Sequence, residues 1–256
     1  MAHDHNWLNE AWKKEEDLVK KIVDAGSAQE LYNSILDKEK MTPTGGSILE
    51  IICMDGRLDE TNKGGSVYAR DGGSGILRDA DGLEKIADGY ARVAMELGVE
   101  TIRLTSHGDC GAWSLSGKNK EEGEKYYNLL RDTIAKKIEE ADLSVNVVLE
   151  YIPNEEKDKE GRGLRFPHIE RAVYYVQAPS FNSQMAPGLP AGFVISREYF
   201  APDYAMVNVA IAIKIAFGGH GFGERFSVAQ PFLLVAVADS KEKMEERKKE
   251  LERAKQ

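Results

Sequence analysis

The 256-residue chain is acidic, with 34 basic and 43 acidic side chains and a formal net charge of −9. This balance argues against nucleic acid and anionic membrane as partners, and no apolar run has the length of a membrane span. Hydrophobic residues make up 42% of the chain, enough for the core of a single α/β domain over 1–256. Because the first residues lack a secretory pattern and the cysteines occupy separate motifs, we expect a cytoplasmic protein.

Residues 1–40 are expected to form an N-terminal helical arm. Apolar residues recur at helical spacing over 7–24, with Trp7 and Trp12 among them, and a second, shorter helix is expected over 28–38. The two tryptophans fit either an ordinary core or an arm that packs on a second subunit. The local pattern does not choose between these alternatives.

Residues 46–152 have the element order of a parallel sheet flanked by helices. Short apolar runs bounded by turn residues predict the strands, and longer segments with apolar residues three and four apart predict the helices. Such an alternation is typical of parallel sheets with right-handed crossovers. In chain order we expect a strand over 48–52, a strand over 66–70, a helix over 79–97, a strand over 101–105, a helix over 121–141 and a strand over 145–152.

Residues 153–240 are an elaboration of this core, and a charged tail helix is expected to follow them. Over 206–217, alternating apolar residues suit a strand, whereas Pro202 before the segment and Gly218 after it are typical of a helix. We favour a buried helix, because alanines occupy much of the remaining surface. The other expected elements are a solvated charged loop over 154–165, strands over 171–177, 193–200 and 230–238, and the tail helix over 241–256.

The only two cysteines of the chain and one histidine follow two of the expected strands. Cys53 comes directly after the first strand, and His107 and Cys110 follow the strand 101–105. Ligand sites in open α/β sheets lie beyond the carboxyl ends of the strands, where these side chains should meet. Two thiolates and an imidazole form a soft tetrahedral site that suits Zn²⁺ and leaves a fourth position for water. The sequence therefore predicts zinc as the cofactor, with these three residues as its ligands.

Three segments resemble the β-class carbonic anhydrases. Residues 51–58, Ile-Ile-Cys-Met-Asp-Gly-Arg-Leu, are similar to the family's Cys-x-Asp-x-Arg signature. Residues 106–112, Ser-His-Gly-Asp-Cys-Gly-Ala, are similar to its Gly-His-x-x-Cys-Gly segment. Residues 67–73, Val-Tyr-Ala-Arg-Asp-Gly-Gly, resemble its Val-x-x-Arg-Asn-Ala-Gly strand and loop. The resemblance covers residues 46–115 and fades beyond them.

This resemblance implies a β-carbonic-anhydrase-like fold and the reversible hydration of CO₂ to bicarbonate by zinc-bound hydroxide. It implies that Asp55 accepts a hydrogen bond from the zinc-bound water and that Arg57 holds Asp55 ionised and in place. N-terminal helices in the family often pack on a partner subunit. The resemblance therefore also implies a homodimer or a higher homo-oligomer, with CO₂ and bicarbonate as small-molecule partners.

Departures from the family pattern keep alternatives open. Ser106 replaces a glycine, and Asp71 and Gly72 replace Asn-Ala, which changes residues expected to shape the substrate pocket. The alternatives are a hydrolase of a CO₂-like molecule, such as carbonyl sulfide or carbon disulfide, and a non-catalytic zinc protein. A subgroup of the family, with tryptophan three residues before the first cysteine, has a state in which the aspartate displaces the zinc-bound water. Glu50 at that position argues against this state, and we read His220 as part of a turn rather than as a proton shuttle.

Overall fold

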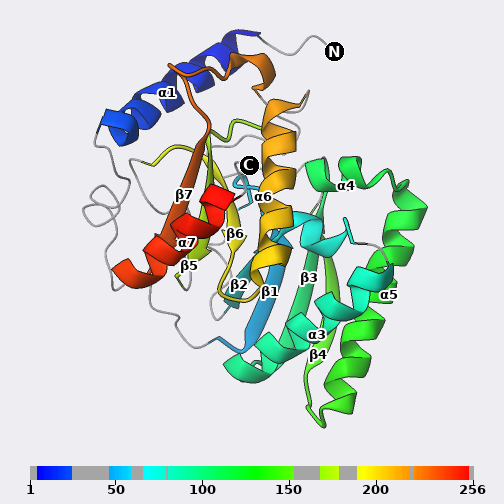
Figure 1. Ribbon diagram of the computed structural model, residues 1–256. Helices are drawn as coiled ribbons and strands as arrows, with labels where there is room; N and C mark the ends of the chain where they lie inside the picture. Colours follow the sequence, from blue (N-terminus) through cyan, green and yellow to red (C-terminus); the bar gives the residue numbers. More distant parts are fainter. Residues whose placement is uncertain are drawn as a thin grey trace.

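Two parallel β-sheets form the framework of the protein in the computed structural model (Figure 1). The structure describes residues 5–24, 46–58, 66–78, 80–152, 168–178, 189–218 and 222–253. The larger sheet has the order β2 (Ser66–Asp71), β1 (Ile48–Cys53), β3 (Thr101–His107) and β4 (Asn146–Ile152). The smaller sheet has the order β6 (Gly192–Ser196), β5 (Ala172–Gln177) and β7 (Leu233–Ala238). Every strand pair in these ranges is parallel.

Helices cover both sheets (Figure 1). They are α1 (His5–Asp24), α3 (Ala80–Leu97), α4 (Gly111–Ser116), α5 (Lys120–Glu140), α6 (Pro202–Phe217) and α7 (Lys241–Arg253), with short 3₁₀ turns at η2 (Gly72–Gly75) and η4 (Gly223–Arg225). α3 and α5 pack together against the larger sheet, and α7 packs on β5 and β7 of the smaller one. α6 contacts β5 and β6 on one side and the loops of the larger sheet on the other.

Side chains of the smaller sheet alternate between two cores. Val173 and Tyr175 of β5 point into the main core, which they share with Ile51 of β1 in the larger sheet. Tyr174 of the same strand points the opposite way, into a second core that Ile22 of α1 closes. Successive residues of a strand face opposite sides, so one strand can serve both cores. The main core therefore spans both sheets.

Hydrogen bonds also join the two sheets close to the end of β1. The backbone N–H of Val194 in β6 donates to the carbonyl oxygen of Met54 at 2.9 Å. The backbone N–H of Arg70 in β2 donates to the hydroxyl of Ser196 in β6 at 2.9 Å. The smaller sheet is thus attached where the chain leaves the first strand of the larger sheet.

The predicted α/β class, with parallel sheets flanked by helices, is confirmed. The favoured helix over 206–217 is also confirmed as part of α6, which begins with Pro202 where the missing N–H has no helical partner to lose. The strand expected over 193–200 is wrong beyond Ser196, because the chain turns there. In that turn the backbone N–H of Phe200 donates to Arg197 O at 3.4 Å.

Two further elements differ from the prediction. β7 begins at Leu233 rather than at residue 230, because Ser227 and Gln230 exchange backbone hydrogen bonds of 3.0 and 3.1 Å and close a turn. The helix α4 is not predicted at all, since six residues give too little periodicity for detection. It begins directly after Cys110, so this short element affects the expected site.

Trp12 packs within its own chain. Its ring meets the ring of Phe222 edge-on at 4.6 Å between centroids, and the guanidinium of Arg171 lies 3.7 Å above it. Trp12 is partly buried by these contacts, so neither alternative is decided, and the expected homo-oligomer stays a prediction. None of the helices in the described ranges combines the length and the apolar character needed to cross a membrane. The expected helix over 28–38, the loop over 154–165 and His220 lie outside the described residues.

Candidate metal centre

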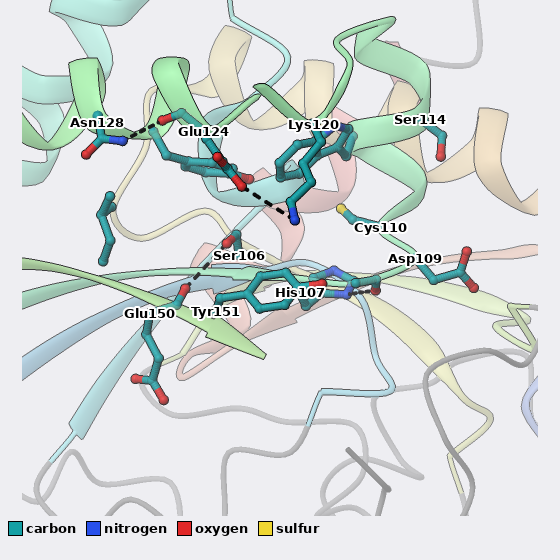
Figure 2. A pocket seen from close by; sticks show the side chains of 14 residues that line it. Ser106, His107, Asp109, Cys110, Ser114, Lys120, Glu124, Asn128, Glu150 and Tyr151 are labelled. Carbon is teal, nitrogen blue, oxygen red and sulfur yellow. Dashed lines mark hydrogen bonds and ion pairs between the residues drawn. The ribbon is translucent and has the colours of Figure 1, made fainter. Parts of the chain in front are cut away.

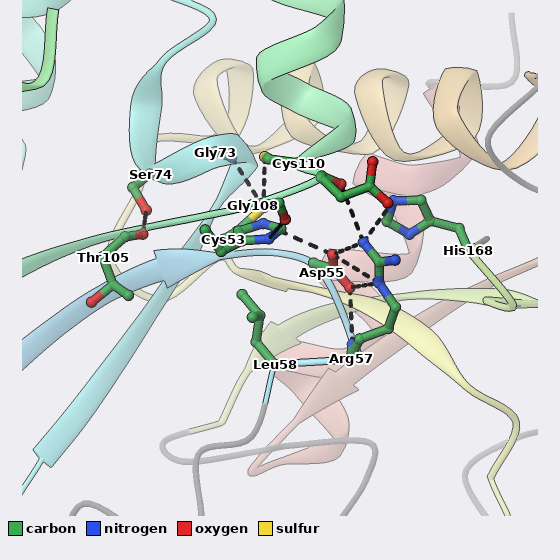
Figure 3. A network of polar contacts seen from close by, with 12 residues as sticks. Cys53, Asp55, Arg57, Leu58, Gly73, Ser74, Thr105, Gly108, Cys110 and His168 are labelled. Carbon is green, nitrogen blue, oxygen red and sulfur yellow. Dashed lines mark hydrogen bonds and ion pairs between the residues drawn. The ribbon is translucent and has the colours of Figure 1, made fainter. Parts of the chain in front are cut away.

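Cys53, His107 and Cys110 meet where β1 and β3 end (Figure 3). These strands are parallel neighbours, with Ile48 opposite Thr101, so both leave the sheet at the same edge. Cys53 and His107 are the last residues of their strands, and Cys110 directly precedes α4. The three ligand atoms lie within 4.8 Å of one another, and all three residues are buried. The structure thus brings the three predicted ligands together.

The free ring nitrogen of His107 lies in this group. Its Nδ1 is 2.8 Å from the carbonyl oxygen of Gly108, which can only accept, so Nδ1 carries the proton and Nε2 keeps a lone pair. Nε2 is buried and finds no hydrogen-bond partner among the described residues. A buried acceptor without a partner is unfavourable unless a metal or water satisfies it. The donor set of one such nitrogen and two sulfurs therefore fits Zn²⁺.

The pKa values of the two thiols are shifted in opposite directions. Their sulfurs lie 3.8 Å apart. The pKa of Cys110 is lowered because its sulfur accepts from the Cys53 thiol and from the N–H groups of Trp113 and Ala112, against the effect of burial. Burial, followed by the neighbouring Cys110, raises the pKa of Cys53 well above its usual value. Without a metal, the two thiols therefore ionise in separate steps, and a bound cation would favour the loss of both protons.

Gly73 allows the backbone to approach Cys53. Its N–H donates to the Cys53 sulfur at 3.2 Å, and its φ of +56° lies in the left-handed region that favours glycine. A Cβ at this position would lie 2.6 Å from Cγ2 of Ile76 and 3.1 Å from Cβ of Ala112. Only glycine can therefore supply this N–H group without displacing its neighbours.

Asp55 and Arg57 form a buried ion pair beside the ligand group. Arg57 donates to Asp55 Oδ1 from its backbone N and its Nε, both at 2.9 Å, and to Oδ2 from Nη2 at 2.5 Å. Burial alone would raise the pKa of Asp55, but the guanidinium of Arg57 holds it well below its usual value. Oδ2 lies 3.8 Å from Nε2 of His107. An ionised acceptor therefore stands next to the three ligands.

Arg70 supports the loop that carries this ion pair. Its Nη1 donates to the carbonyl oxygens of Cys53 and Asp55 at 3.0 and 2.9 Å, and its Nη2 donates to that of Leu58 at 3.0 Å. The side chain is fully buried. One guanidinium thus donates to three carbonyl groups in the segment from Cys53 to Leu58 and holds this segment in place.

Asp71, which departs from the resembled pattern, is held by two helices. Its Oδ2 accepts from the hydroxyl of Tyr90 in α3 at 2.6 Å and from that of Tyr204 in α6, and its Oδ1 accepts from Nδ2 of Asn208 at 2.7 Å. Burial raises the pKa values of Tyr90 and Tyr204 well above the usual value of a tyrosine. The three donors therefore satisfy both oxygens of the Asp71 carboxylate. The two donors from α6, Tyr204 and Asn208, attach this helix to the larger sheet.

His168 and Glu170 extend the polar network, although no sequence motif singles them out. They directly precede β5, and His168 lies 111 positions after Arg57 in the chain. Nδ1 of His168 is 3.0 Å from Oε2 of Glu170, and its Nε2 is 3.3 Å from Nη2 of Arg57 (Figure 3). Both residues are buried. The only local signal is a His-x-Glu pair before an expected strand, which is too weak to indicate a site.

A cavity of about 600 Å³ adjoins the ligand group (Figure 2). His107 and Cys110 form part of its wall, so a molecule inside it would reach the ligands. Lys120 and Glu124 of α5 lie 3.8 Å apart and border the same cavity. Much of the remaining wall consists of the large side chains of Trp113, Tyr127, Leu149 and Tyr151.

Comparison of the chain with family models, with curated proteins and with solved structures finds no match. The α/β class therefore rests on the structure itself. The resemblance to the β-class carbonic anhydrases rests on the residues of three short segments, two of which carry the candidate metal ligands.

Proposed function

We propose that this protein is a zinc enzyme that interconverts CO₂ and bicarbonate. Cys53, His107 and Cys110 would hold the ion. The observation that carries the proposal is the buried Nε2 of His107, which has no hydrogen-bond partner among the described residues and lies 3.8 Å from Oδ2 of an ionised Asp55. When bound in such a site, Zn²⁺ lowers the pKa of a coordinated water and supplies a hydroxide nucleophile near neutral pH.

Asp55 has the geometry of a hydrogen-bond acceptor for the attacking water. Its carboxylate is ionised, lies within 3.8 Å of the ligand nitrogen of His107 and is fixed by Arg57 from three donor atoms. A fixed anionic acceptor would accept a hydrogen bond from the zinc-bound water or hydroxide and so orient an oxygen lone pair towards the carbon of CO₂. The same hydrogen bonds favour this role over direct ligation, because a ligating Asp55 would have to give up part of its pairing with Arg57.

The size of the cavity supports a second candidate function. A volume of about 600 Å³ with aromatic walls is large for CO₂ and accommodates larger, more polarisable analogues. A hydrolase of carbonyl sulfide or carbon disulfide would use the same ligands and the same Asp55. A non-catalytic zinc protein is the weaker alternative, because a structural site does not need a buried, ionised carboxylate beside its ligands.

Metal content and three substrates test these candidates together. We expect the protein to bind about one zinc per chain and to hydrate CO₂ in a stopped-flow pH-indicator assay. Cys53→Ser and Cys110→Ser should each lose zinc, because an alcohol is a poor ligand compared with a thiolate. Hydrolysis of carbonyl sulfide or carbon disulfide without CO₂ hydration would select the second candidate. Folded protein that takes up no zinc would contradict the metal assignment, and zinc-loaded protein inactive on all three substrates would leave the non-catalytic alternative.

A further inference from the structure

We propose that His168, oriented by Glu170, is a positioning residue that fixes Arg57 and, through Arg57, the carboxylate of Asp55. The proposal assigns a role to the segment before β5, for which the sequence predicts none. Its consequence for activity rests on the proposed function, whereas its consequence for Arg57 does not.

The hydrogen-bond chemistry fixes the tautomer of His168. A guanidinium has only donors, so the approach of Arg57 Nη2 to Nε2 at 3.3 Å requires Nε2 to accept. The proton of a neutral imidazole then lies on Nδ1, which faces Glu170 Oε2 at 3.0 Å and Oε1 at 3.2 Å. A carboxylate accepts this proton, and the three groups form one consistent chain of donors and acceptors.

His168 contacts the same nitrogen of Arg57 that bonds Asp55 Oδ2. Nη2 donates to Asp55 Oδ2, and its other neighbours are His168 Nε2 at 3.3 Å and the carbonyl oxygen of Asp109 at 3.5 Å. Nη2 carries two hydrogens, so it can donate to Asp55 and to His168 at the same time. Because Nη2 and Nε both bond Asp55, a tilt of this plane would also move the carboxylate.

His168 is closely packed and buried. The imidazole packs against the ring of Phe193 in β6, with 5.4 Å between ring centroids. Glu170 and His168 are 2% and 4% exposed, so neither side chain has solvent through which to reorient. The smaller sheet thus presents a buried acceptor to an ion pair carried by the larger sheet.

The same carboxylates and imidazole do not favour a second metal ion. Asp55, His168 and Glu170 offer ligand atoms within 4.8 Å of one another. However, the guanidinium of Arg57 lies between Asp55 and His168 (Figure 3) and bonds both of them. A metal at this position would have to displace a cation that already neutralises Asp55. The geometry therefore points to positioning of Arg57.

Three variants separate the effect of the hydrogen-bond acceptor on His168 from the effect of the size of its side chain. His168→Phe keeps a ring against Phe193 but removes the acceptor, His168→Gln restores an oxygen acceptor, and Glu170→Gln weakens the control of the tautomer. Tyr174→Phe is the matched control, because it removes a buried hydrogen bond of 2.7 Å to Pro190 O in the same sheet without touching Arg57. All variants are compared with the parent at equal zinc content.

The first readout does not depend on activity. Long-range ¹H–¹⁵N spectra resolve the tautomers of the five histidines in the chain, and His168→Gln identifies the signal of His168. We expect a neutral imidazole with the proton on Nδ1. Hydrogen exchange at Arg57 Nε should accelerate in His168→Phe and remain slow in His168→Gln and Tyr174→Phe. A proton on Nε2, or unchanged exchange in His168→Phe, would overturn the proposal.

The second readout is CO₂ hydration. We expect His168→Phe to lose about 10- to 100-fold in kcat, with zinc retained and KM little changed, and His168→Gln to recover most of that loss. Glu170→Gln should fall between them. Equal losses in both His168 variants would show that packing matters rather than the acceptor, and parental kcat in His168→Phe would overturn the role. If the parent does not hydrate CO₂, the proposed function fails, while tautomer and exchange still decide the role of His168. If His168→Phe does not fold, His168→Gln, Glu170→Gln and the tautomer decide it.

Discussion

Asp55 shows how single hydrogen bonds decide the chemistry of a buried residue. It is 1% exposed, and burial would by itself favour the neutral acid. The side chain and the backbone of Arg57 donate to both of its oxygens and hold it ionised. Nη2 of its partner Arg57 is in turn 3.3 Å from Nε2 of His168. The charge on one carboxylate therefore depends on a chain of neighbours.

We expect Asp55→Asn to retain zinc but to lose most CO₂ hydration, about 10- to 100-fold. The amide cannot accept from Arg57 at both of its terminal atoms, and it is a weaker acceptor for water than a carboxylate. Rates should be compared at matched zinc content. Asp109→Asn is the control, because this exposed residue on the neighbouring loop has a φ of +52°, which asparagine tolerates. Full activity of Asp55→Asn would refute the orienting role, and loss of zinc would indicate that Asp55 is a ligand.

Removal of the metal should make the two cysteines sensitive to oxidation. Their sulfurs are 3.8 Å apart and need only a small approach to bond. Chelated protein treated with oxidised glutathione should form a Cys53–Cys110 disulfide, in which two thiols lose their hydrogens and the oxidant is reduced to two thiols. Thiol titration should fall from two to zero per chain, and intact mass should show no bound glutathione. Zinc-loaded protein is the control and should keep both thiols, and their persistence in chelated protein would contradict the prediction.

Secondary-structure elements meet closely at the site, and the loop after β1 has little room. A Cβ on Gly56 would lie 2.2 Å from the carbonyl oxygen of Gly192, the first residue of β6. The neighbour is backbone, so it cannot rotate away as a side chain could. The contact lies between Asp55 and Arg57 in the sequence, so the fit of two elements controls the ion pair.

Gly56→Ala should therefore lower the free energy of unfolding by about 1–3 kcal/mol, the usual effect of overpacking. It should also reduce zinc affinity, because the loop carries Cys53 at its start. Gly89→Ala is the matched control, since a Cβ at that position in α3 meets nothing within 4 Å. Alanine there should raise the free energy of unfolding by about 0.5–1 kcal/mol. Denaturant unfolding measures both, and a Gly56→Ala protein as stable as the parent would contradict the close fit.

Helix α7 is attached to the smaller sheet by Glu250, and this attachment should depend on pH. Oε2 of Glu250 accepts from the hydroxyl of Tyr175 at 2.7 Å and from Nε of Arg197 at 2.9 Å. Burial raises the pKa of Glu250, but these hydrogen bonds outweigh it and leave the pKa below its ordinary value of 4.5. A lowered pKa in the folded state adds stability that is present above pH 4.5 and is lost as the pH falls through the folded pKa.

Glu250→Gln should accordingly destabilise the protein at pH 7, and the difference from the parent should shrink as the pH falls below 4.5. Unfolding midpoints measured from pH 7 down to the acid limit of the folded state give this difference directly. Glu245→Gln is the control on the same helix, because Glu245 is half-exposed and, among the described residues, forms an ion pair with Lys248 alone, at 4.0 Å. A Glu250→Gln difference that is the same at every pH would contradict the role of its charge.

On the scale of the whole molecule, the two sheets share one core. Ile51 of the larger sheet and Tyr175 and Phe193 of the smaller one belong to the same buried cluster. A backbone hydrogen bond from Val194 to Met54 reinforces the contact. A shared core of this kind means that neither sheet can lose its packing without exposing the other.

We therefore expect a single cooperative unfolding transition. Trp12 reports on the smaller sheet through Arg171, which directly precedes β5, and Trp113 reports on α4 and α5 through Tyr127, with 5.6 Å between ring centroids. Trp12→Phe and Trp113→Phe leave one local reporter each, with Trp7 common to both. After correction for the stability of each variant by circular dichroism, the fluorescence midpoints should coincide with those of the helix signal. Two separate midpoints would show that the sheets unfold independently.

Local sequence was enough to predict the strands that deliver Cys53 and His107, because apolar runs and their bounding residues reflect burial of the strand itself. Local sequence was also enough to predict α6, because Pro202 and Gly218 bound the segment and alanines occupy much of its remaining surface. The candidate metal ligands could be predicted as a group because parallel strands end at one edge of a sheet.

Tertiary structure alone decided the division into two sheets, the close approach of Gly56 to Gly192 and the pairing of His168 with Arg57. These contacts join residues that are more than 100 positions apart, and neither partner carries a local pattern that depends on the other. The sequence around a histidine that precedes a strand does not show whether its side chain faces solvent or a buried guanidinium. Only the packing of β5 and β6 against the end of β1 removes the water and leaves Arg57 as its partner.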